Sequence, residues 1–230
     1  MAKRNRHKQN LDKLTEGTPT KRKVVQKVGQ IVDKEEQTVL IRKTPICWGI
    51  PMDEVGYSKF WTNFTRNANM MPWDGVITTE STYLPDARNT IHENYVKSSD
   101  LPFLMMLDSD ILFPYNIVGM LMKHNLPIVG GWYRNKKKNT PVVYDFVSTT
   151  DGVNNFRHRE APGTGLEKVD GMGAGCWLMT RETAIALGER PYSMNGGGED
   201  LVLCKKLMDL NIPLHVDWDL ALAHVGVFFV

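Results

Sequence analysis

The chain has 230 residues, of which 42% are hydrophobic and 23% charged, enough for one large domain or two small ones with an apolar core. Its net charge of +2 is unevenly divided: residues 1–27 hold nine Lys and Arg and two acidic residues, and the remainder carries a net charge of −5. No segment has the ~20 consecutive apolar residues of a transmembrane helix and no signal-peptide core is present, so neither a membrane span nor secretion is expected. The three cysteines are far apart, without disulfide or zinc spacing, and a reducing cytoplasm is the expected location.

The first part of the chain is a basic segment. Residues 1–43 are expected to form a flexible N-terminal arm, and residues 44–230 a single globular domain. One interpretation of the arm is attraction to nucleic acid or another anionic surface. A solubilising arm is favoured, because no aromatic residues are interleaved with the basic ones.

From residue 44 onward, short apolar runs alternate with amphipathic segments. Strands are predicted at 46–50, where Pro51 would end the run, and at 75–79 and 103–107, with helices at 57–68 and 85–97 between them. This alternation predicts βαβ units, and hence an α/β fold with a mostly parallel central sheet flanked by helices.

The second half continues in the same manner. Residues 151–167 are polar and rich in glycine and charge, so a mobile loop is expected there. The remaining predicted elements are helices at 115–124, 181–187 and 201–210, and strands at 127–131, 142–147, 176–179 and 214–217.

An acidic corner, Asp108–Asp110, directly follows the apolar strand at 103–107. Open α/β sheets bind their ligands at the carboxyl ends of the strands. Two close carboxylates are costly to bury unless a cation pairs them, and their oxygens suit Mg²⁺ or Mn²⁺. The corner therefore predicts a divalent metal that carries a phosphorylated substrate; the alternative is a solvated turn in which Asp108 caps a helix.

Two further acidic residues, Glu199 and Asp200, follow three glycines and open the last predicted helix. Capping of the helix N-terminus is one interpretation, and a catalytic base at a rigid helix end is the other. His224 is similarly open to two interpretations, an ordinary core or surface histidine or a neutral imidazole that completes a metal site.

Glycines at 171, 173 and 175 are typical of loops that cradle phosphates, but here they lead into a strand, which is not the context of a dinucleotide fingerprint. No phosphate-binding P-loop motif is present either. A dehydrogenase or a P-loop enzyme is therefore not expected. The basic loop at 132–139 is either a solvated loop or a site that neutralises phosphates or holds an anionic acceptor.

Taken in order, these segments resemble one family, the GT-A-fold glycosyltransferases, close to the family 2-like group of bacteria, archaea and their viruses. The resemblance covers residues 44–226. It rests on Ala87-Arg88-Asn89, Leu107–Pro114 with its Asp-x-Asp, Ile128–Tyr133, Val169–Met179, Gly198–Lys206 and His224-Val225-Gly226.

The resemblance implies a metal-dependent transfer of a sugar from a nucleotide-sugar, a UDP- or GDP-sugar, to an acceptor hydroxyl. Asp108, Asp110 and His224 would bind Mn²⁺ or Mg²⁺. Glu199 and Asp200 would be catalytic, with Asp200 as the base if the reaction is inverting; inversion and retention are both open. The other donor contacts that we expect are Pro51 at the nucleobase, Arg88 near the phosphates, and Ser109 and Gly173. The family's nucleobase aspartate is not evident after the second predicted strand, and Glu80 or Ser81 stands near its place.

The sequence leaves the acceptor class open: it is a glycan, a protein or, through the basic arm, a modified nucleic acid. The acceptor would be recognised by residues 132–139, by residues 151–167 or by a partner. If the protein is viral, the expected location is the host cytoplasm. Two other functions stay open. A sugar-nucleotide nucleotidyltransferase would need a Gly-rich loop near residue 50, which is missing. A basic-armed nucleic-acid binder would have a structural, non-catalytic acidic corner.

Overall fold

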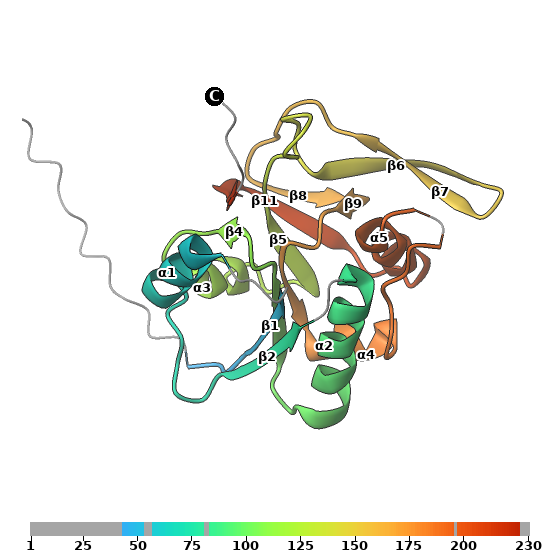
Figure 1. Cartoon of the computed structure of the whole chain (residues 1–230). Helices are drawn as coiled ribbons and strands as arrows, with labels where there is room; N and C mark the ends of the chain where they lie inside the picture. Colours follow the sequence, from blue (N-terminus) through green and yellow to red (C-terminus); the bar gives the residue numbers. More distant parts are fainter. Residues whose placement is uncertain (1–42, 53–56, 81–82, 196, 226–230) are drawn as a thin grey trace, which may run out of the picture. The chain divides into compact units, whose positions relative to one another are not determined.

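The computed structural model describes residues 43–52, 57–80, 83–195 and 197–225. Its largest element is a seven-stranded sheet with the order β2-β1-β3-β10-β5-β11-β8 (Figure 1). The predicted arm at 1–43 lies almost wholly outside the described residues, as does Gly226. The strands of the large sheet are β1 (Cys47–Met52), β2 (Gly75–Glu80), β3 (Phe103–Leu107), β5 (Ile128–Trp132), β8 (Leu166–Val169), β10 (Cys176–Thr180) and β11 (Leu214–Ala221).

Two small sheets accompany the large one. One pairs β4 (Ile111–Leu112) with β12 (Ala223–His224), and the other joins β6 (Val143–Thr150), β7 (Val153–His158) and β9 (Gly171–Met172). The first of them matters for the site, because it brings the last described residues next to the acidic corner.

The large sheet is mixed rather than mostly parallel. The pairs β1–β2, β1–β3 and β5–β11 are parallel, as the βαβ alternation predicts. The pairs β3–β10, β5–β10 and β8–β11 are antiparallel. β10 is reversed because it begins at the edge where β3 ends, with the Asp108 N–H donating to the Gly175 carbonyl at 2.9 Å. The α/β class and the helix-flanked sheet are confirmed.

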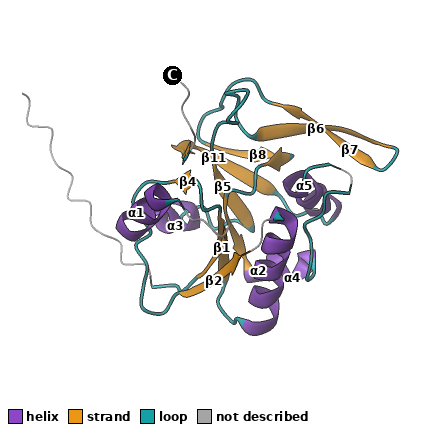
Figure 2. Ribbon diagram, viewed as in Figure 1, coloured by secondary structure: helices purple, strands orange, loops and turns teal. Residues whose placement is uncertain are grey.

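Helices cover both faces of the sheet (Figure 2). Because successive strand side chains point to opposite faces, Trp48 and Met105 pack with α1 and α3, and their neighbours Cys47 and Leu104 pack with α2, α4 and α5. No helix in the described part of the chain is long and apolar enough to cross a membrane. The helices are α1 (Ser58–Asn67), α2 (Leu84–Ser98), α3 (Ile117–Met122), α4 (Arg181–Leu187) and α5 (Glu199–Asp209).

The expectation of a loop throughout 151–167 is wrong, since only the turn at 151–152 and residues 159–165 lie outside strands here. β6 and β7 form an antiparallel hairpin, and Leu166–Val169 is strand β8, paired with β11. The hairpin turns at Asp151 and Gly152, whose φ angles of 50° and 75° are those of a type I′ turn. The Asp-Gly pair is a hairpin signal, and the polar composition around it hid the strands.

The expected end of the first strand at Pro51 is also wrong, since β1 continues to Met52. β3 pairs with β1 only over Cys47–Gly49. Beyond Gly49, β1 therefore needs no N–H donor towards β3, and a proline is tolerated in the strand.

Candidate active site

The acidic corner lies at the carboxyl end of β3, the edge at which α/β sheets bind ligands. Its turn is held by two backbone hydrogen bonds, from Asp108 N–H to the Gly175 carbonyl at 2.9 Å and from Ile111 N–H to the Asp108 carbonyl at 3.1 Å. The side chains of Asp108 and Asp110 are 18% and 22% exposed, and Ser109 between them is half-buried. The two carboxylates are thus reachable by a ligand but only partly hydrated.

Arg88, on α2, lies beneath this corner and is only 2% exposed. Its Nη2 donates to both carboxylate oxygens of Asp108 at 2.7 Å, and its Nη1 donates to Oε1 of Glu199. Burial opposes the guanidinium charge, but Asp108 and Glu199 outweigh it and raise the pKa of Arg88. Here the guanidinium binds carboxylates, and its predicted contact with donor phosphates stays a prediction.

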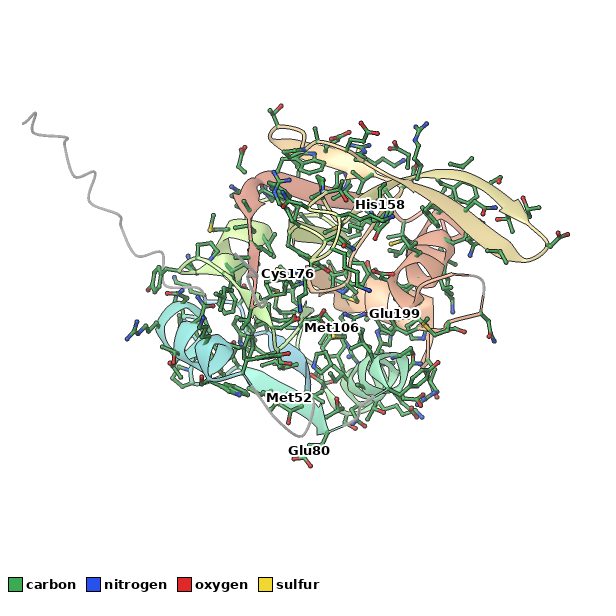
Figure 3. The ribbon with its side chains drawn as sticks, turned by 45° about the horizontal axis from the view of Figure 1, so that its top comes forward. Met52, Glu80, Met106, His158, Cys176 and Glu199 are labelled. Atoms are coloured by element: carbon green, nitrogen blue, oxygen red, sulfur yellow. The ribbon has the colours of Figure 1, made fainter. Side chains whose placement is uncertain are left out.

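Glu199 and Asp200 form the first turn of α5. Figure 3 labels Glu199 of α5 and Met106 of β3, which belong to the two elements that the Arg88 bridge connects. The Asp200 Oδ1 accepts from the Leu201 N–H at 2.8 Å. Burial, reinforced by the negative charge of Glu199, raises the pKa of Asp200 from 3.8 to about 6. The two neighbouring carboxylates therefore differ in their roles. Glu199 is held by Arg88, and Asp200 is a carboxylate that can exchange a proton near neutral pH.

His224 reaches the acidic corner from the end of the chain. β12 pairs with β4, with His224 opposite Ile111, and the Val225 N–H donates to the Asp110 carbonyl at 2.6 Å. The His224 Nδ1 lies 2.9 Å from the Arg134 carbonyl, which makes Nδ1 the protonated nitrogen and leaves the lone pair on Nε2. Burial lowers the pKa of His224, so the imidazole is neutral at pH 7.

The structure does not contain a preformed metal cluster: among the described positions, no three His, Cys, Asp or Glu side chains are grouped so as to hold an ion. Asp108 is bound by Arg88, and Asp110 Oδ2 lies 2.5 Å from the Lys136 ammonium. By chemical type the donors nevertheless suit Mn²⁺ or Mg²⁺, because two of them are carboxylates and the third is a neutral imidazole whose other nitrogen is fixed by a carbonyl. The metal ligation by Asp108, Asp110 and His224 stays a prediction.

Tyr133 is a site residue that the sequence reasoning missed. It is buried at the end of β5, its hydroxyl accepts from the Gly175 N–H at 3.0 Å, and its ring packs edge-on against His224 with centroids 4.6 Å apart. Burial, together with the negative charges of Asp108 and Asp200, raises the pKa of Tyr133, so its hydroxyl stays neutral. The signal was the Gly-x-Gly-x-Gly run itself, which leaves room for a large neighbour.

Gly173 is buried against this tyrosine. A Cβ at Gly173 would lie 2.2 Å from the Tyr133 Oη and 2.7 Å from Val142 Cγ1. Packing accounts for the glycine, and its predicted contact with the donor stays a prediction.

Gly173→Ala is expected to destabilise the protein by about 1–3 kcal/mol, because the new methyl group overpacks a rigid site. Urea unfolding of Gly173→Ala, Tyr133→Phe and the double variant measures this. Removing the hydroxyl makes room, so the double variant should lose less stability than the sum of the two single changes. Strict additivity would show that Tyr133 does not exclude a side chain at position 173.

The predicted nucleobase region lies at the ends of β1 and β2. Pro51 is buried opposite Thr79, and Met52 lies opposite Glu80 in the parallel register (Figure 3). Parallel strands end at one edge, so Pro51 lies on the same edge as the acidic corner. Residues 53–56 and Ser81 are outside the described residues, and the nucleobase contact stays a prediction.

No protein-family model and no curated protein matches the sequence, but solved structures match the fold. The crystal structure of A197 from STIV matches with a TM-score of 0.60 at 16% identity, over 79% of this chain and 85% of that one. The fold is GT-A-like. The crystal structure of GalNAc-T7 with UDP, GalNAc and Mn²⁺ also matches, with a TM-score of 0.55 at 12% identity, over 79% of this chain and 43% of that one. The resemblance to GT-A glycosyltransferases is thus confirmed for the fold.

Proposed function

We propose that the protein is a metal-dependent glycosyltransferase that moves a sugar from a UDP- or GDP-sugar to an acceptor hydroxyl. The observation that carries the proposal is the buried bridge of Arg88, which joins Asp108, in the acidic corner, to Glu199, the neighbour of Asp200 in the first turn of α5. The GT-A-like fold supports it, as does the presence of UDP, GalNAc and Mn²⁺ in the matching GalNAc-T7 structure.

The roles of the residues follow from their chemistry. Asp108, Asp110 and His224 would hold Mn²⁺ or Mg²⁺, which when bound supplies positive charge to the leaving nucleoside diphosphate. Asp200 accepts the proton of the acceptor hydroxyl, whose oxygen forms a bond to the anomeric carbon. The bond from that carbon to the diphosphate breaks, and the diphosphate keeps the electron pair. Arg88 keeps the Asp108 carboxylate oriented throughout.

The acceptor is proposed by class only. A glycan, a protein or a hydroxylated base of modified nucleic acid carries a suitable hydroxyl, and the last of these would use the basic arm at 1–43. Loss of affinity for modified DNA when the arm is deleted would favour that class. Unchanged affinity would leave a glycan or a protein.

Binding of the donor can be tested without knowing the acceptor. UDP, GDP and their sugars are screened by thermal shift with and without Mn²⁺; a ligand at about 100 times its Kd adds about 2.7 kcal/mol of stability. For a domain of this size, that corresponds to roughly 5–10 °C in Tm. We expect a manganese-dependent shift for one nucleotide, and its loss in Asp110→Asn.

The matched control is Asp151→Asn, which removes the same charge at the β6–β7 turn, where Asn tolerates the φ of 50°. It should keep the full shift. No shift with any nucleotide in the folded protein would overturn the proposal and favour a non-catalytic nucleic-acid binder.

A further inference from the structure

One lysine of the basic loop is placed differently from its neighbours. Lys136 Nζ lies 2.5 Å from Asp110 Oδ2, whereas Lys137 and Lys138 are exposed and have no ion pair in the part of the chain that the structure describes. A cation of the protein therefore pairs with one of the carboxylates that the proposed function assigns to a divalent metal.

The backbone that carries Lys136 is a tight, well-bonded turn. The Asn135 N–H donates to the Thr140 carbonyl at 2.8 Å, and the Asn139 N–H donates to the Asn135 carbonyl at 3.0 Å. The Asn135 side chain also accepts from the N–H groups of Lys137 and Lys138, at 2.9 and 3.1 Å. The contact with Asp110 is therefore made by the lysine side chain reaching out from a fixed base.

The same turn is tied to the other predicted metal ligand. Arg134, one residue before Asn135, forms an isolated β-bridge with Pro141, and its carbonyl orients the His224 imidazole. The position of Lys136 over Asp110 and the orientation of His224 thus depend on one short segment. Asp110 and His224 would help to hold the metal, and the Lys136 ammonium already pairs with the first of these two residues.

The ammonium and the metal compete at Asp110, because two cations beside one carboxylate repel each other. The lysine side chain is 44% exposed, and an ion pair with that much solvent is readily broken. A displaced ammonium on a flexible four-carbon stem is well suited to a phosphate oxygen. A nucleoside diphosphate brings such oxygens to the metal.

We propose that Lys136 neutralises Asp110 in the free protein and becomes a ligand of the donor diphosphate once the metal has displaced it. This inference rests on the proposed function. Lys136 then lowers the affinity for the metal alone. When the metal and the nucleotide bind together, Lys136 raises the affinity instead. Metal and nucleotide then bind cooperatively, each raising the affinity for the other by the same factor.

The test is a set of calorimetric titrations on the full chain: Mn²⁺ alone, UDP and GDP alone, and each nucleotide at saturating Mn²⁺. In Lys136→Met we expect tighter binding of Mn²⁺ alone and weaker binding of the nucleotide at saturating Mn²⁺. The coupling between the two should fall by about 5-fold or more, the lower end of typical coupling factors. Lys137→Met, which changes a neighbouring exposed lysine in the same way, should behave as the wild type.

The outcomes separate this inference from the proposed function. If Asp110→Asn abolishes Mn²⁺ binding but Lys136→Met and Lys137→Met give the same affinities and coupling, the role of Lys136 is overturned and the metal site stands. If Mn²⁺ binds neither alone nor with nucleotide, or binds equally well to Asp110→Asn, both are overturned.

Discussion

Asp200→Asn is expected to lower the transfer rate by about 10²–10⁴-fold, the usual contribution of a positioned general base. The amide keeps the shape of the side chain and an oxygen for the Leu201 N–H, but it cannot accept the acceptor's proton. In the wild type, kcat/KM should rise with pH through about 6, the pKa to which burial raises Asp200, and then level off. In Asp200→Asn this limb should disappear.

Asp200→Asn should lower the transfer rate but raise the stability of the folded protein at neutral pH. The folded protein raises the pKa of Asp200 from 3.8 to about 6, so folding favours the protonated form. This contribution to stability is fully present below about pH 4 and is lost as the pH rises through 6. Asp200→Asn, which stays neutral, should therefore be more stable than the wild type at pH 7 by about 1–3 kcal/mol, and not at pH 4.

Thermal melts from pH 4 to 8 measure this difference. The control is Glu182→Gln, which removes an exposed carboxylate from the first turn of α4 and should show no such gain. A loss of activity together with a loss of stability at pH 7 would mean that Asp200 is a structural helix cap instead of a base.

The helices and strands could be predicted from the sequence wherever the apolar residues follow a single spacing, that of a helix or that of a buried strand. The helix at 85–97 and the strand at 103–107 are α2 and β3, within one residue at each end. Strand direction could not be predicted. The apolar run in β10 looks the same in a parallel or an antiparallel strand, and its direction depends on the edge from which the chain enters the sheet.

In the candidate site, too, local features could be predicted from the sequence and contacts between distant residues could not. The sequence places Asp108 and Asp110 at the end of a buried strand, because that relation is local. The contact between Arg88 and Glu199 joins two residues 111 positions apart, and no periodicity of the sequence predicts it. Tyr133 was missed for this reason too, because it looks like an ordinary strand-end residue until the folded chain brings Gly175 against it. Lys136 was predicted as part of a basic loop that could neutralise phosphates, but its contact with Asp110 was not.

Arg88→Met is expected to cost about 3–5 kcal/mol of stability, because it leaves two partly buried carboxylates without their counter-ion. For a domain of this size, that lowers Tm by roughly 6–20 °C. Arg190→Met is a matched control: Arg190 also joins two carboxylates, Asp86 at 3.0 Å and Glu93 at 3.1 Å, but is 47% exposed. Its loss should cost no more than about 1 kcal/mol.

Arg88→Met also tests whether the bridge serves the metal site. With the guanidinium gone, Asp108 carries an unpaired charge beside Asp110. Added Mn²⁺ can neutralise both carboxylates, so it should raise the Tm of Arg88→Met by more than it raises the Tm of the wild type or of Arg190→Met. Equal losses of stability in the two arginine variants would contradict the buried bridge. A large loss that Mn²⁺ does not reduce would make Arg88 a purely structural link between α2, β3 and α5, and would remove the support that it gives to a metal at the acidic corner.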